Sequence, residues 1–237
     1  MKPVIPIAAL VALCCLPFGQ PSDPPLSTVA DEQLSAYATV GPKAVPYSDC
    51  GIDSNFQPVH HTGRRHLLYL FGQLAWANGI PAESYAIELM RDSRGLRRIN
   101  AMTCPGSRFI WVSVTAWELL SDSDAALTLL LAHELGHADH RPAADLRRDP
   151  MTDAERKLVF SLTLRQLSEV AVDQRAADLM RTAGYTDREI AAAAHLILAR
   201  DTDGVISKAT ESHPAGRDRV NLLTYYLGRE QEVLARK

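Results

Sequence analysis

The stretch LLLAHELGHADH, Leu129 to His140, places charged and imidazole side chains in a run of Leu and Ala. A buried carboxylate or imidazole is costly unless a partner satisfies it. The segment HELGH within this stretch is an instance of HExxH. On a helix, residues four apart lie on one face, so His133 and His137 can direct two imidazole nitrogens at one ion. The stretch therefore predicts a helix that carries a metal.

Two further residues of this helix suit hydrolytic chemistry. Glu134 lies about 100° around the helix from His133, so its carboxylate can reach a water on the metal without binding the metal. Zinc lowers the pKa of such a water to about 7, and Glu134 would take its proton and later deliver it to the leaving amine. Gly136 lets another backbone or a substrate approach closely. A chance HExxH in a helix without metal is the alternative.

A catalytic zinc usually takes three protein ligands, so HExxH leaves one to be found. The segment SEVAVDQRAADLMRTAGY, which begins at Ser168, places Glu169 and Asp173 four residues apart on a predicted helix. If that face opposes HELGH, Glu169 can supply the third ligand, and Asp173 can bind the second ring nitrogen of a ligand histidine. The same spacing also fits a solvated helix face, and spacing alone does not decide between them.

Three ordered motifs resemble the zinc metallopeptidase family of the CAAX prenyl protease and the HtpX-type membrane proteases, including soluble periplasmic relatives of BepA type. The motifs are NAMTCPGSRFIWVSVTAWELLSD before HExxH, then EVAVDQRAADLMRTAGY, then SHPAGRDRVNLL. The resemblance spans about residues 65 to 225. It implies one zinc ion per chain, bound by His133, His137 and Glu169, with Glu134 as the catalytic base.

The resemblance also implies roles for residues outside HExxH. Asp173 would support a ligand histidine, His213 would stabilise the oxyanion, and Arg219 would be a structural residue near the site. Asn100 and the strand after it would form the edge to which an extended peptide pairs. The segment 141–165 has no membrane spans, which fits a soluble branch of the family.

The predicted fold class is α+β: a mainly helical zincin-type metallopeptidase domain with a small antiparallel sheet. Helices are expected over 65–78, 121–138, 153–182, 187–199 and 217–234. Strands are expected over 84–90, 97–104 and 108–114. Ser121 followed by Asp124 resembles a capping box at the start of the HExxH helix.

The N-terminal segment MKPVIPIAALVALCCLPFGQ has the layout of a secretory signal peptide, with one Lys before an apolar run. A hydrophobic helix of the mature protein is the alternative. The expected organisation is a signal peptide over 1–20, an irregular extension over 21–60 and a metallopeptidase domain over 61–237. A periplasmic or secreted location follows. Cys14 and Cys15 suggest lipid attachment, which the large residue before them disfavours.

Composition limits the expected partners. The formal net charge of −3 provides no basic field for nucleic acid or an anionic membrane surface. No stretch after residue 20 is long and apolar enough to span a bilayer, so membrane association would need lipidation or an envelope protein complex. Polypeptide substrates are the expected partners. After export, Cys50 and Cys104 would either pair as a disulfide or stay as free thiols.

The expected function is zinc-dependent hydrolysis of peptide bonds in unfolded or misassembled exported proteins, a substrate class that comes from the resemblance alone. The alternative is a zinc-bearing, chaperone-like adaptor with a gated or inactive site, in which 20–60 or 141–152 covers the metal. Glu134 favours the enzyme, because a protein that only binds its clients has no need of that carboxylate.

Overall fold

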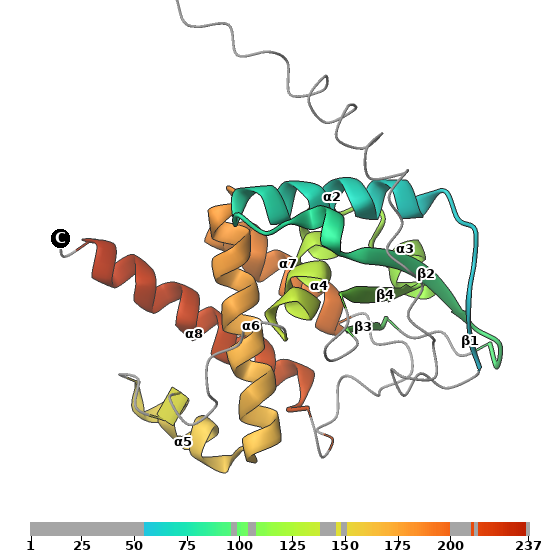
Figure 1. Cartoon of the computed structure of the whole chain (residues 1–237). Helices are drawn as coiled ribbons and strands as arrows, with labels where there is room; N and C mark the ends of the chain where they lie inside the picture. Colours follow the sequence, from blue (N-terminus) through green and yellow to red (C-terminus); the bar gives the residue numbers. More distant parts are fainter. Residues whose placement is uncertain are drawn as a thin grey trace, which may run out of the picture.

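The computed structural model describes residues 55–95, 99–103, 108–137, 146–147, 151–199, 210 and 213–235. In these ranges the chain forms seven α-helices and a mixed sheet of four strands (Figure 1). The predicted mainly helical α+β class is therefore confirmed. The expected signal peptide, the extension up to residue 54 and the pairing of Cys50 with Cys104 lie outside the described residues.

The four strands form a sheet in the order β1-β2-β4-β3. They are β1 (Phe56–Pro58), β2 (Ala86–Asp92), β3 (Ala101–Thr103) and β4 (Phe109–Ser113). β1 is antiparallel to β2 and β3 is antiparallel to β4, but β2 and β4 run parallel. The expectation of an antiparallel sheet is thus wrong for the central pair. The first four residues of β4 are buried on both faces, so β4 takes the position between β2 and β3.

The helix that carries HExxH lies among four of the other helices. The helices are α2 (Gly63–Ala77), α3 (Val114–Leu120), α4 (Asp124–Gly136), α5 (Asp153–Ser161), α6 (Leu164–Thr182), α7 (Asp187–Ala199) and α8 (Gly216–Ala235), with a 3₁₀ turn at Ala82–Ser84. α4 packs against α2, α6, α7 and β3 (Figure 1). Every residue from Ala126 to Ala132 is buried, so α4 is covered on all sides over two turns, and Thr128 is the one polar residue among these seven. The polar side chains of HExxH lie at the C-terminal end of α4.

The start of α4 differs from its prediction. Ser121 and Asp124 do not form the expected capping box, because the residues before them form the separate helix α3. Ser123 caps α4 instead, and its hydroxyl accepts a hydrogen bond from the N–H of Ala126 at 3.3 Å. The predicted boundary is therefore wrong by a few residues, while the helix itself is confirmed.

The long helix predicted over 153–182 is two helices. Leu162 has an extended conformation after α5, and Thr163 and Gln166 form a capping box that starts α6. The predicted helices at 65–78, 187–199 and 217–234 correspond to α2, α7 and α8. Within the described ranges, no helix has the length and hydropathy needed to cross a bilayer.

Candidate metal centre

The candidate metal centre lies where the C-terminal end of α4 passes α6. At this crossing Gly136 faces Val172, and a Cβ on Gly136 would lie 3.2 Å from both the carbonyl oxygen and the Cγ1 of Val172. These distances are shorter than ordinary van der Waals contact. The close approach of a second backbone that was expected at Gly136 is therefore present, and it sets the two helices near enough for their side chains to meet.

Three potential ligands meet at this crossing. The Nε2 atoms of His133 and His137 lie 3.4 Å and 3.9 Å from Oε2 of Glu169. One ligand atom from each residue lies within 4.8 Å of the others, and no second group of this kind occurs in the described part of the chain. Ligand atoms around a tetrahedral zinc ion are about 3.4 Å apart, given bonds of about 2.1 Å. These three side chains could therefore hold a metal ion.

The environment of Glu169 fits a cation. Its Oε2 atom is buried and has no hydrogen-bond partner, although the Nε2 atoms of three histidines face it. A buried carboxylate oxygen without a partner is destabilising, and a metal ion at this point would remove that cost. Two imidazoles and one carboxylate also form a donor set that zinc accepts. The residues present thus fit a bound metal.

The ring of His133 is held from the side opposite to Glu169. Its Nδ1 atom lies 2.9 Å from Oδ1 of Asp173. Asp173 in turn accepts two hydrogen bonds from Arg219, from Nη2 to Oδ1 at 2.6 Å and from Nε to Oδ2 at 2.8 Å. All three side chains are 13 % exposed. With Nδ1 engaged by the carboxylate, Nε2 is left to face Glu169 and a metal.

The charges of these groups are tightly coupled. Burial favours neutral His133, but the hydrogen bond to Asp173 and the nearby Glu169 raise its pKa to about 9. Burial also favours protonated Asp173, yet the guanidinium of Arg219 and the ring of His133 hold its pKa well below its usual range. The pKa of Glu169 is lowered too, because the neighbouring histidines outweigh its burial. In the metal-free chain, a proton on His133 would therefore compete with a metal.

Glu134 lies beside β3. It is 5 % exposed, and this burial raises the pKa of its carboxyl despite hydrogen bonding from Thr103. The hydroxyl of Thr103 also donates to the backbone carbonyl of Glu134 at 3.1 Å. Sequence reasoning missed Thr103, whose one signal is the alternation of residues along its strand. A carboxylate with a raised pKa is a better proton acceptor than an ordinary one.

His213 is also brought to the centre. Its Nε2 atom lies 3.3 Å from Oε2 of Glu169, and its side chain is 48 % exposed. Burial lowers the pKa of the ring, with Glu169 opposing the shift and Arg219 adding to it. These effects together favour the neutral form of the ring. The ring lies next to the three candidate ligands.

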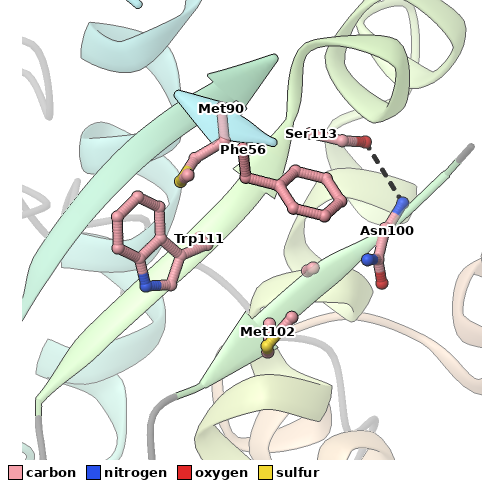
Figure 2. A pocket seen from close by; sticks show the side chains of 7 residues that line it. Phe56, Met90, Asn100, Met102, Trp111 and Ser113 are labelled. Atoms are coloured by element: carbon pink, nitrogen blue, oxygen red, sulfur yellow. Dashed lines mark hydrogen bonds between the residues drawn. The ribbon is translucent and has the colours of Figure 1, made fainter. Parts of the chain in front are cut away.

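Asn100 immediately precedes β3. Its N–H donates to the hydroxyl of Ser113 at 3.2 Å (Figure 2). Its carbonyl accepts from the N–H of Ser113 at 2.8 Å. A hollow of about 20 Å³ lies beside it, lined by Phe56, Met90, Met102 and Trp111 among others. That volume holds about one water molecule. Thr103, the β3 residue that bonds to α4, lies three positions after Asn100, or roughly 10 Å along an extended chain.

Comparisons of this chain with protein-family models, with curated proteins and with solved structures found no match. The resemblance to zinc metallopeptidases therefore gains no support from them. The finding that stands is geometric. Two histidines and one glutamate, from α4 and α6, could bind a metal ion whose identity the geometry leaves open.

Proposed function

We propose that this chain is a zinc-dependent metalloendopeptidase. The observation that carries the proposal is the convergence of His133 and His137 on the buried Oε2 of Glu169, at 3.4 Å and 3.9 Å from their Nε2 atoms. In this proposal, zinc is the ion that these three residues hold. When bound, it would supply the Lewis acidity that makes water a nucleophile near neutral pH.

The proposed roles of the other residues follow from their surroundings. Glu134 accepts the proton of the attacking water and delivers it to the leaving amine, a task that its raised pKa favours. Asp173 and Arg219 orient the ring of His133 and hold its tautomer. His213 donates a hydrogen bond to the oxygen that becomes negative when the peptide carbonyl is attacked.

The proposed substrate is an extended polypeptide. β3 lies at one end of the described sheet, and Thr103 connects this strand to the backbone of Glu134. A peptide added beside β3, along the edge that begins at Asn100, would pass the end of α4. The resemblance adds unfolded or misassembled exported proteins as the substrate class, and an envelope protein complex as a partner.

The test is cleavage of casein, an unfolded protein, by the full chain loaded with zinc. The variant is Glu134→Gln, and the matched control is Glu83→Gln, which changes an exposed carboxylate on the 3₁₀ turn. We expect the wild type and the control to cleave casein, a chelator to stop both, and Glu134→Gln to bind zinc without cleaving. One zinc per chain with no cleavage by any protein would overturn the peptidase and leave a metal-binding protein.

A further inference from the structure

Gln166 is a buried polar residue on α6, three residues before Glu169, and its side chain is used at both ends. Its Oε1 atom accepts a hydrogen bond from the N–H of Thr163 at 3.0 Å, while the hydroxyl of Thr163 accepts from the N–H of Gln166 at 3.2 Å. These two bonds form the capping box of α6. The capping box leaves the Nε2 end of the amide for other partners.

The Nε2 end of Gln166 reaches the backbone around His213. It donates to the carbonyl of Thr210 at 2.8 Å and lies 3.4 Å from the carbonyl of His213. Thr210 and His213 are also bonded to each other: the N–H of His213 donates to the Thr210 hydroxyl at 3.0 Å, and the N–H of Thr210 donates to the His213 carbonyl at 2.8 Å. Gln166 therefore links both Thr210 and His213 to α6.

α6 meets His213 at two points. Gln166 holds the backbone, and Glu169, nearly one helical turn later, faces the ring with Oε2 at 3.3 Å from Nε2. The ring is about half exposed, so burial alone does not fix its direction. Gln166 and Glu169 are held at a fixed separation by α6. The contacts that they make with the backbone and the ring of His213 therefore set the position of the ring relative to the candidate metal ligands.

We propose that Gln166 is the positioning residue for His213, in addition to its capping of α6. Capping alone does not require this amide, because glutamate serves equally well at the third position of a capping box. Glutamate has no N–H to donate, and its carboxylate would face two carbonyl oxygens. The effect on catalysis rests on the proposed function, whereas the effect on the position of His213 does not.

The test separates capping from positioning. Gln166→Glu keeps the capping acceptor and removes the donor to the carbonyls of Thr210 and His213, whereas Thr163→Ala removes the capping hydroxyl and keeps that donor. The position of His213 is followed by side-chain nitrogen NMR of the full, zinc-loaded chain, with its signals assigned through His213→Asn. We expect the signals to change towards those of an exposed histidine such as His60 in Gln166→Glu, and to stay in place in Thr163→Ala.

Unchanged His213 signals in a folded Gln166→Glu variant would overturn the proposal, whether or not the chain cleaves peptides. If Gln166→Glu does not fold, Gln166→Met removes the Nε2 donor together with the acceptor for the Thr163 N–H, while the Thr163 hydroxyl still caps α6. A change of the His213 signals in Gln166→Met that Thr163→Ala does not show would then support the proposal, and its absence would overturn it. Where the wild type cleaves casein, we expect Gln166→Glu to lower kcat about 100-fold with KM within about twofold. Failure of the wild type to cleave would refute the proposed function alone.

Discussion

The protonation of His133 leads to a prediction for the stability of the metal-free chain. The ring is buried against Asp173 and Glu169, and these carboxylates hold its pKa at about 9, compared with 6.5 for an unperturbed histidine. Between these two values, the folded chain keeps a proton on His133 that the unfolded chain has lost. The free energy of unfolding must therefore depend on pH in this range.

The sign and size of the effect follow from the two pKa values. A histidine whose pKa is raised by folding stabilises the folded chain below the pKa of the unfolded state, and the stabilisation is lost as the pH rises through the folded-state value. The difference between 6.5 and about 9 corresponds to about 3 kcal/mol. We expect the metal-free chain to lose about this much stability between pH 6.5 and 9.5.

Urea unfolding of the chelator-treated full chain at the two pH values measures this loss. The variant His133→Asn carries no titrating ring, so its change over the same range corrects for every other group. With zinc in excess, the loss should disappear, because a metal on Nε2 replaces the proton. A wild-type change equal to that of His133→Asn would refute the coupling of His133 to the two carboxylates.

Two other predictions concern the helix crossing. Glu169→Gln keeps the size of the side chain but removes its charge. We therefore expect the zinc content, measured by atomic emission, to fall well below one ion per chain. A variant that still binds one zinc ion per chain would exclude Glu169 as a ligand. Gly136→Ala should lower the free energy of unfolding by about 1 kcal/mol, because crowding against Val172 costs about 1–3 kcal/mol and the helix propensity of Ala returns about 1. Urea denaturation measures this change, and a variant more stable than the wild type would contradict it.

The residues of the metal centre could be predicted because their spacing is local. His133 with His137, and Glu169 with Asp173, are four apart, and helical geometry alone puts each pair on one face. The boundaries of α7 were predicted for a similar reason, since its ends lie beside turn residues. The periodicity of apolar residues indicates which side chains of an element are buried, but it does not indicate which elements pack beside it. It could not show that β4 lies between β2 and β3.

Contacts between distant segments were beyond such reasoning. Thr103 and Gln166 are ordinary residues of a strand and a helix start. The sequence marks Thr103 only by the alternation along its strand and Gln166 only as the third residue of a capping box. Their partners, Glu134 for Thr103 and the backbone of His213 for Gln166, are set by how α4, α6 and β3 pack. A polar side chain with two ends, such as a buried amide, becomes informative only when both of its partners are known.

The bond between Arg219 and Asp173 bears on the order in which the centre is completed during synthesis. α8 follows α4 and α6 in the chain, so a growing polypeptide contains all three candidate ligands before it contains Arg219. In that interval Asp173 lacks the guanidinium that lowers its pKa. The carboxylate that orients the ring of His133 is therefore not yet fixed in place. A nascent chain therefore contains all three candidate ligands before Arg219 can bind Asp173. We expect the site to become ordered only after α8 has been made.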